Sequence, residues 1–261
     1  MRSTSILSVF AVLAGLVLAL LSVCCGRSGS GARSGAAPAG EAISATFALA
    51  YQPAADELEI RRAQDAVRAA PDQASGYARL ARAFLVRRRE TGDARLNGHA
   101  QDALLAAQAR DPHDPEVMTI AILDLHDRHR FREALAAARE LVRARPGDAT
   151  GHLLEGDAAL ELGDYEGAAA AFQRALDRAL DLRTYSRGGT LRWLNGDVDG
   201  ALELMDMAIG AAGPKSREPA AWCWVEVGEM LRRRGDQRRA AAAAERALAL
   251  VEGYLPARAL R

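Results

Sequence analysis

The amino-acid sequence predicts an all-α protein made of stacked helix pairs, and three observations carry this prediction. Alanine, the residue with the highest helix propensity, supplies 57 of the 261 residues, while aromatic residues, which strands favour, make up 5%. Helical runs end at Pro112 and Pro146, which stand 34 residues apart, and a proline cannot continue a helix. Breaks between runs recur at the dipeptides Gly163-Asp164, Gly196-Asp197 and Gly235-Asp236.

Charge and cysteine content exclude several classes of protein. Lys and Arg together number 34, as do Asp and Glu, so the formal net charge is zero. Nucleic-acid binding draws affinity from excess cations that displace phosphate counterions, so we expect no nucleic-acid partner. The three cysteines, of which Cys24 and Cys25 are adjacent and Cys223 stands alone, argue against a disulfide scaffold. We expect Cys223 to be a small, buried, apolar residue.

Residues 1–23 have the pattern of a signal peptide or a membrane anchor. Arg2 precedes an apolar run from Ile6 to Val23, and a charged start before such a run is typical of export. Residues 21–24, Leu-Ser-Val-Cys, resemble a bacterial lipobox and predict lipidation of Cys24, although Val23 stands where lipoproteins usually have Gly, Ala or Ser. An uncleaved anchor and ordinary secretion are the alternatives. Lipidation, an uncleaved anchor and ordinary secretion all predict an exported protein. Lipidation and the anchor also make it membrane-associated through its N-terminus.

Residues 24–52 are expected to form a flexible tether. The stretch from Gly26 to Gly40 consists almost entirely of Gly, Ser and Ala, a composition that cannot bury a core. We therefore expect the folded domain to span residues 53–261 and to stand off a membrane on this tether.

A period of 34 residues organises the remainder of the chain. Ala134 and Ala168 are 34 residues apart, and each follows an aromatic residue, Phe131 or Tyr165, by three positions. We interpret each period as two antiparallel helices, with the small residue where the backbones approach most closely. One such hairpin cannot bury its own apolar face, so neighbouring hairpins must stack.

This pattern resembles the tetratricopeptide repeat (TPR) family, and more narrowly a set of uncharacterised bacterial exported TPR proteins. The repeat from Ala149 carries the family's residue types at Gly156, Tyr165, Ala168, Phe172 and Ala175. The resemblance implies a right-handed α-α superhelix, a TPR solenoid of about five helix-turn-helix repeats with a half repeat at each end. The five repeats are expected near residues 74–114, 115–148, 149–181, 182–213 and 221–254.

The ends and two irregularities depart from the regular period. Ala54 to Pro71 resembles a lone second helix, and Tyr254 to Arg261 resembles the start of a sixth repeat. The first repeat is about seven residues too long between its helices, in residues 87–100. Gly210 to Pro219 is expected to be a ten-residue loop before the fifth repeat.

The resemblance also implies a binding surface, because the first helices of TPR units line a concave groove. Arginines at two points around an apolar middle predict an extended partner segment that carries carboxylates, since guanidinium groups pair with carboxylates in a bidentate way. Ordinary solvated arginines are the alternative. The Lys/Asn/Arg clamp of chaperone-binding TPR domains is absent, because the chain has one lysine, Lys215. The predicted groove residues are Arg79, Arg82, Ile120, Leu123, Leu153, Asp157, Arg183, Arg187, Trp222 and Glu226.

Motifs of catalysis are missing, so we expect no enzyme, no catalytic residues, no metal site and no cofactor. The sequence has neither a nucleophile elbow between a strand and a helix nor a phosphate-binding P-loop. His126 and His129 have the spacing of one helical turn and are the basis of a distant alternative, a metal-dependent enzyme. We expect His129 instead to be an ordinary polar residue in the turn between two helices.

The predicted function is a non-enzymatic scaffold that binds a segment of another protein in the concave groove. The alternative is a self-associating structural protein, because the C-terminal half repeat is expected to expose Leu255, Ala259 and Leu260 without a polar cap. A homo-oligomer is therefore a second possible assembly.

Overall fold

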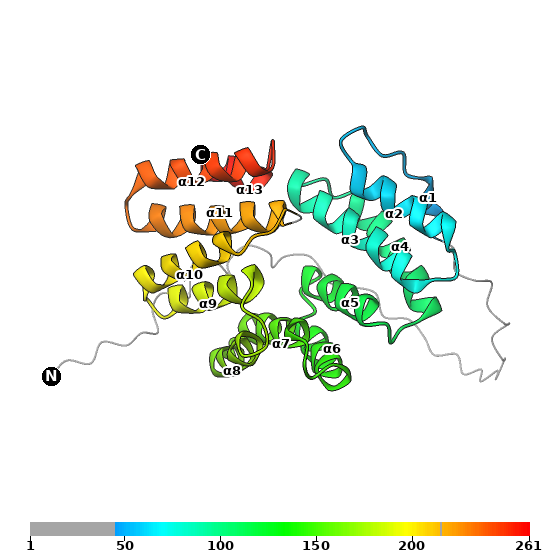
Figure 1. The fold of residues 1–261 in the computed structure, drawn as a ribbon, viewed down its shortest axis with the longest axis horizontal. Helices are drawn as coiled ribbons and strands as arrows, with labels where there is room; N and C mark the ends of the chain where they lie inside the picture. The colour runs from blue at the N-terminus through cyan, green and yellow to red at the C-terminus, as the bar shows by residue number, and fades with distance from the viewer. Residues whose placement is uncertain (1–44, 215) are drawn as a thin grey trace, which may run out of the picture. The chain divides into compact units, whose positions relative to one another are not determined.

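The computed structural model describes residues 45–214 and 216–261, and every element in these ranges is a helix. All of these helices belong to one compact unit (Figure 1). The helices are α1 (Thr46–Ala50), α2 (Leu58–Ala69), α3 (Ala74–Thr91), α4 (Leu96–Arg110), α5 (Pro115–Asp127), α6 (Phe131–Ala144), α7 (Ala149–Glu161), α8 (Tyr165–Leu176), α9 (Leu182–Leu194), α10 (Val198–Gly210), α11 (Arg217–Arg233), α12 (Gln237–Leu250) and α13 (Leu255–Leu260).

The predicted all-α solenoid is confirmed. Each of the five expected repeats forms one helix pair, in the order α3/α4, α5/α6, α7/α8, α9/α10 and α11/α12, and successive pairs pack side by side (Figure 1). The half repeats are also present, as α2 before the first pair and α13 after the last.

Glycine followed by aspartate ends one helix of a pair and starts the next. Gly163, Gly196 and Gly235 adopt φ values of +80°, +82° and +88°, in the left-handed region that favours glycine. The following aspartate then caps the second helix: the Asp164 carboxylate accepts a hydrogen bond from the Gly167 backbone N–H at 2.8 Å. These local signals explain why the turns within these pairs were predictable.

Small residues let the helices of a pair approach closely. Ala134 and Ala168 are fully buried, as the repeat pattern predicted. Gly156 on α7 lies against the buried ring of Phe172 on α8, so that an added Cβ would lie 2.5 Å from Phe172 Cδ1 and closer still to Cε1. Packing at this position therefore requires glycine opposite phenylalanine.

Arginines at the ends of two second helices donate hydrogen bonds to the carbonyls that follow the preceding second helix. Arg110 donates through Nε to the Pro71 carbonyl at 2.6 Å and through a terminal nitrogen to the Ala106 carbonyl at 2.7 Å. Arg178 repeats this arrangement two repeats later, with the carbonyls of Pro146 and of Arg174, both at 2.6 Å. We call these two side chains the arginine bridges.

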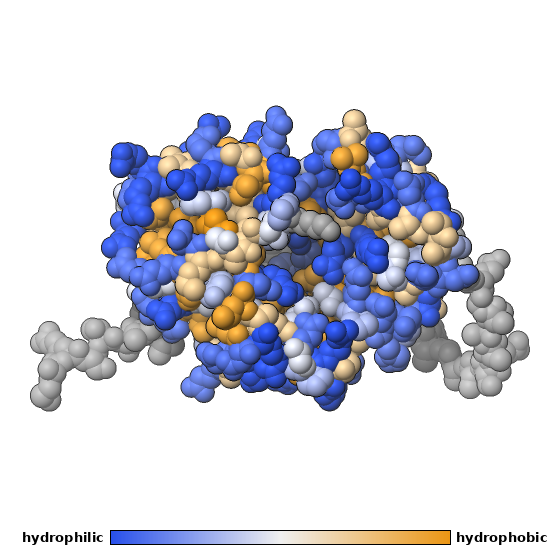
Figure 2. All heavy atoms as spheres, viewed as in Figure 1, coloured by the Kyte–Doolittle hydropathy of each residue, from blue (hydrophilic) through white to orange (hydrophobic). Residues whose placement is uncertain are grey.

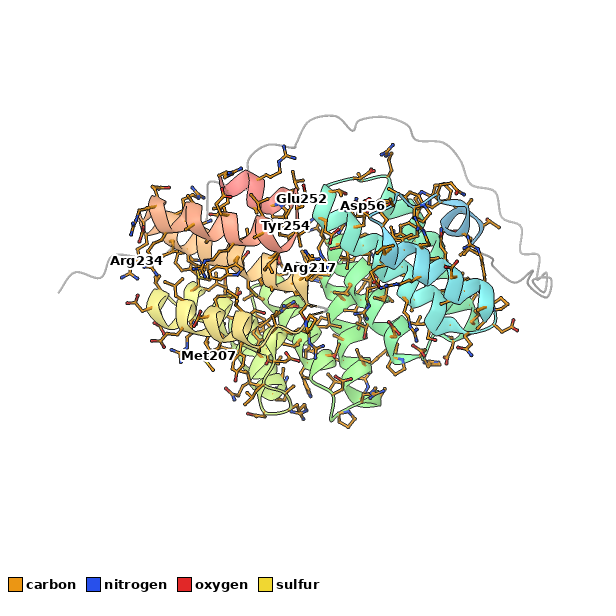
Figure 3. The ribbon with its side chains drawn as sticks, turned by 45° about the horizontal axis from the view of Figure 1, so that its top comes forward. Asp56, Met207, Arg217, Arg234, Glu252 and Tyr254 are labelled. Carbon is orange, nitrogen blue, oxygen red and sulfur yellow. The ribbon has the colours of Figure 1, made fainter. Side chains whose placement is uncertain are left out.

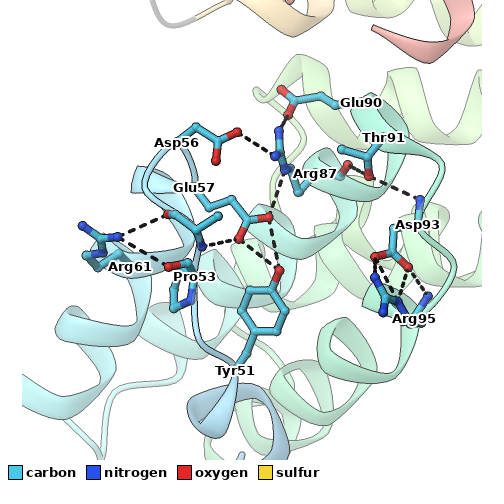
Figure 4. Close-up of polar contacts among 11 residues, drawn as sticks. Tyr51, Pro53, Asp56, Glu57, Arg61, Arg87, Glu90, Thr91, Asp93 and Arg95 are labelled. Atoms are coloured by element: carbon cyan, nitrogen blue, oxygen red, sulfur yellow. Dashed lines mark hydrogen bonds and ion pairs between the residues drawn. The ribbon is translucent and has the colours of Figure 1, made fainter. Parts of the chain in front are cut away.

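The folded unit starts before residue 53, which corrects the predicted extent of the tether. Ala45 and Ala48 are fully buried, and the Ala48 N–H donates to the Asp102 carboxylate at 2.9 Å. Nearby, the buried Glu57 carboxylate accepts hydrogen bonds from the Tyr51 hydroxyl and from Arg87 on α3 (Figure 4). These bonds attach residues 45–57 to the first repeat.

Both irregularities lengthen first helices instead of forming long loops. The extra residues of the first repeat extend α3 to 18 residues, and Gly92, with φ +74°, ends it. The connection predicted from Gly210 to Pro219 is shorter than expected, because Gly210 still belongs to α10 and α11 begins at Arg217. Pro219 lies in the first turn of α11, where its missing N–H removes no intrahelical hydrogen bond.

The C-terminal half repeat is better covered than expected. Leu260 has 8% of its surface exposed and packs onto Gly228 of α11, so the prediction that it is exposed is wrong. Leu255, with 43% exposed, and Ala259 do face outward. Because α13 lies against α11, α12 and α3, one of the three apolar residues behind the self-association alternative is covered, while the other two stay exposed.

Candidate functional site

The ten predicted groove residues lie on the first helices of the five pairs, two on each of α3, α5, α7, α9 and α11. Figure 2 shows one face of the unit, where hydrophobic residues gather over α9 to α12 at the left and hydrophilic residues dominate elsewhere. The exposed or half-buried members of the predicted set are Arg79, Arg82, Leu123, Asp157, Arg183, Arg187, Trp222 and Glu226.

Two of the predicted residues belong to the core and not to an open surface. Ile120 is fully buried and Leu153 has 4% of its surface exposed. Each packs among apolar residues of neighbouring helices, which leaves it no area for a partner. The apolar middle of the predicted groove is therefore reduced to Leu123.

Arg79 and Arg82 of α3 share one carboxylate, which belongs to Glu116 of α5. The distances to its oxygens are 3.9 and 3.7 Å. Such pairs between largely exposed groups contribute little free energy, because water and salt screen them. Two cations with one anion leave a net positive charge at this point.

Arg187 joins three first helices. Its guanidinium binds both carboxylate oxygens of Asp157 on α7, at 3.2 and 3.1 Å, and lies 5.8 Å from the ring centroid of Trp222 on α11. Attraction to Asp157 raises the pKa of Arg187 above its ordinary value. The fold therefore brings these three predicted groove residues together, and Arg187 contacts the other two.

Glu226 follows on α11 one helical turn after Trp222. Burial raises the pKa of its carboxyl group, and the neighbouring Glu229 raises that pKa further. Arg233 and Arg187 act in the opposite direction.

Arg183 borders an open pocket of about 760 Å³ at the junctions of three successive helix pairs. Its guanidinium donates to Asp181 at 2.9 Å and to the Thr150 hydroxyl at 3.0 Å. The Thr150 backbone N–H, together with other polar neighbours, lowers the pKa of the pocket residue Asp148. The pocket is lined by His113, Pro115, Ala144, Arg145, Gly147, Asp148, Ala149, Arg178, Ala179 and Arg183.

Three basic pocket residues, His113, Arg145 and Arg178, were missed by the sequence reasoning. That reasoning considered only the first helices, whereas Arg145 and Arg178 directly follow or lie shortly after second helices. Their separation of 33 residues, close to the repeat period, is the signal that would have found them.

The residues behind the enzyme alternative have ordinary surroundings. The rings of His126 and His129 stand edge-on to Phe131, at centroid distances of 5.1 and 5.4 Å. His129 lies in the turn after α5, as predicted. Within residues 45–214 and 216–261, no group of three His, Cys, Asp or Glu side chains is placed to hold a metal ion. Burial raises the pKa of the Cys223 thiol to about 12.

Predictions for the N-terminal segment, including lipidation of Cys24, lie outside the described residues. None of the helices that the structure describes is both long enough and apolar enough to span a membrane.

Comparisons with known proteins agree with this geometry. Residues 121–181 match the family model described as tetratricopeptide repeat. A chain of the APC/C hetero-tetramer Cut9-Hcn1 superposes with a TM-score of 0.59 at 16% identity, over 75% of this chain and 37% of that one. TTC0263, a thermophilic TPR protein of Thermus thermophilus, gives 0.58 at 19% identity, over 71% of this chain and 95% of that one.

A search of curated proteins finds no match. This chain spans little more than a third of the length of the Cut9-Hcn1 chain, so that likeness concerns the fold. The match begins within α5 and ends directly before α9, so it covers most of two helix pairs, α5/α6 and α7/α8. Residues 121–181 are therefore tetratricopeptide repeats, and the helix pairs on both sides of them continue the same TPR solenoid.

Proposed function

We propose that the chain is a non-enzymatic scaffold that binds an acidic, extended segment of another protein across the junctions between successive helix pairs. The observation that carries this proposal is the pocket at the junctions of three helix pairs, where Arg145, Arg178 and Arg183 meet His113. A pocket built at successive junctions suits a partner that runs along the solenoid. As a precedent, the similar chain in the Cut9-Hcn1 structure is part of a hetero-tetramer.

The chemistry of the pocket favours a carboxylate. Three arginines line it. Arg145 lies 3.7 Å from the Asp148 carboxylate and Arg183 lies 2.9 Å from that of Asp181, so the third arginine, Arg178, gives the pocket its excess of positive charge. Arg178 is held by the carbonyls of Pro146 and Arg174, which fixes the guanidinium before any partner arrives. Preorganised guanidinium groups bind carboxylates through short, charge-assisted hydrogen bonds.

The other predicted arginines play a smaller part in this proposal. Arg187 is already bound to both oxygens of Asp157, so a partner carboxylate would have to displace that group. Arg79 and Arg82 keep one excess charge beside Glu116 and form a second, weaker contact point. The proposed partner segment therefore engages the pocket first.

The location of this scaffold is part of the same proposal. The apolar run from Ile6 to Val23 and the following Cys24 support an exported protein that is attached to a membrane by a lipid or by an uncleaved anchor. Mass spectrometry of the mature N-terminus tests it. A diacylglyceryl group on Cys24 or an intact residue 1 supports attachment, and a free N-terminus downstream of Cys25 contradicts it.

Site-specific photocrosslinking in the native cells tests the binding site. A photoreactive residue at Ala179, in the pocket, is expected to capture a partner, and one at Ala170, exposed on α8, is the positional control. Arg145→Glu combined with Arg183→Glu should abolish the capture at position 179. The matched charge reversal Arg143→Glu, on the exposed side of α6, should leave it unchanged.

Two outcomes contradict the proposed site. One is an equal capture by residues 170 and 179. The other is a capture at 179 that survives reversal of both pocket arginines while the purified variant keeps its helical circular dichroism.

A further inference from the structure

The C-terminal end of α3 meets the N-terminal end of α11, although 129 residues separate the groups in contact. Arg89 donates from Nε to one oxygen of Glu218 at 3.2 Å and from a terminal nitrogen to the other oxygen at 3.3 Å. Glu218 is buried, whereas the Arg89 side chain keeps 41% of its surface exposed. The first and last repeats are thus joined by a bidentate ion pair.

The C-terminal half repeat completes this contact. The buried Tyr254 hydroxyl donates to Glu218 at 3.2 Å, so one carboxylate holds groups from α3 and from the start of α13. Next to it, Leu255 packs against Gly92 so closely that an added Cβ there would lie 2.5 Å from Leu255 Cδ2. Figure 3 shows Tyr254 at the end of the C-terminal helices that is adjacent to α3.

Both halves of the contact come from the two departures from the repeat period. Arg89 lies in the extra residues that lengthen α3, and Gly92 ends that extension. Glu218 lies in the first turn of α11, in the stretch where the sequence predicted a loop. A regular 34-residue repeat would supply neither group, so the end-to-end contact is an addition to the repeat architecture.

The electrostatics of the contact favour the closed arrangement. Glu218 has two hydrogen-bonding partners in an environment with little water, where charge-assisted bonds are strong. Burial raises the pKa of the neighbouring Glu90, and the charge of Glu218 adds to that rise. Arg87 and Arg89 act in the opposite direction and lower the pKa of Glu90. Removing the Arg89 charge would leave two acidic groups facing each other.

We propose that Arg89, Glu218 and Tyr254 form a latch that holds the first and last repeats together and that opens without unfolding a repeat. Tyr254 lies in an apolar cluster with Ala221, Val225, Ala247 and Ala257, all on α11 to α13, and it stays there when the partly exposed Arg89 of α3 separates from Glu218. Opening therefore leaves the core of each helix pair intact. A closed latch holds together the two ends of the surface formed by the first helices. An open latch exposes that surface along its length. This inference goes beyond the proposed function, because it requires no partner.

Distance measurement by double electron–electron resonance tests the latch in the full-length chain. Spin labels are placed at Thr91→Cys and Glu252→Cys, two exposed positions on the opposing ends, in a protein with Cys24 and Cys25 replaced by serine. Cys223 is buried and its thiol stays protonated, so it is not labelled. The closed latch predicts one short, narrow distance. Arg89→Glu should cause the loss of this distance in favour of longer, broader ones.

Two further variants keep this test decisive. Arg89→Glu combined with Glu218→Arg should restore the short distance, because the ion pair is rebuilt in reverse. Arg62→Glu, which reverses one charge of the exposed pair with Glu59 on α2, is the matched control and should leave the distance unchanged. Leu255→Ala, a change at a partly exposed side chain, serves as a second opening variant if Arg89→Glu lowers the helical circular dichroism.

Three outcomes overturn the latch. A broad distance distribution in the unmodified protein shows that the ends are not held together. An unchanged short distance in both Arg89→Glu and Leu255→Ala shows that these contacts do not hold it. Loss of helical structure in step with the short distance, in both variants, shows that the ends separate only by unfolding. Because no partner is involved, none of these results bears on the acidic-segment proposal.

Discussion

The contact between Gly156 and Phe172 makes a sharp prediction about the packing of α7 on α8. In the native protein, Gly156→Ala places a methyl group inside the contact distance of a buried ring. Overpacking of this kind costs about 1–3 kcal/mol. Alanine returns about 1 kcal/mol through its higher helix propensity. The net effect on the free energy of unfolding is therefore a loss of up to about 2 kcal/mol.

The sign of this effect should reverse once the ring is removed. Phe172→Ala alone is expected to cost about 3–5 kcal/mol, through lost burial and the cavity that remains. In that background the three atoms nearest to the new Cβ, all from the Phe172 ring, are gone, so we expect the propensity gain of about 1 kcal/mol to remain. The two substitutions are thus coupled by about 1–3 kcal/mol.

Urea denaturation followed by far-ultraviolet circular dichroism measures the four free energies of this cycle. Phe172→Leu provides a milder second background if the alanine variant is too unstable to fit. Gly210→Ala, at a helical glycine whose added Cβ would meet no atom within 4 Å, is the control and should have one effect in every background. Additive effects at Gly156 and Phe172, within about 0.5 kcal/mol, would refute the close contact.

Three further predictions concern single positions. Gly163→Ala should lower the free energy of unfolding by about 1–2 kcal/mol, because its φ of +80° strains any L side chain. Gly147→Ala, with open space around the new Cβ, is the control and should be close to neutral in the same urea titration. Iodoacetamide at pH 8 should alkylate Cys223 only in denaturant, since burial holds its pKa at about 12; mass spectrometry showing rapid native alkylation would contradict this. Asp148→Ala should cost about 1 kcal/mol at neutral pH through loss of the α7 cap. The pKa of Asp148 in the folded state is below its ordinary value of 3.8. The stability that the cap contributes is therefore present above pH 3.8 and disappears as the pH falls through the folded-state pKa. The urea midpoints of the native protein and the variant should then converge in acid.

The helix pairs were predictable because their signals are local. Gly163 and Asp164 set a left-handed turn and a helix cap within a few residues, and Pro146 stops a helix by its own covalent structure. The repeat period then places successive pairs side by side. No knowledge of distant residues is needed for this part of the fold.

The candidate site was less predictable because its character depends on partners in other repeats. The sequence places Arg187 on a first helix, but not beside Asp157, which occupies its guanidinium. Ile120 matched a groove position of the family pattern and yet lies in the core, since a position alone does not fix how a side chain turns. The contact of Arg89 with Glu218 spans 129 residues and breaks the period at both ends, so periodicity cannot reveal it.

The arginine bridges have a consequence for the curvature of the solenoid. Arg110 and Arg178 each grip two backbone carbonyls, one from their own helix and one from the end of the previous second helix. A planar guanidinium fixes the separation and angle of these carbonyls, which a lysine ammonium, as a point charge, would not do. The bend at these two junctions is thereby anchored to main-chain atoms. Exchanges among the apolar packing residues would then alter stability while the pitch of the superhelix stayed the same.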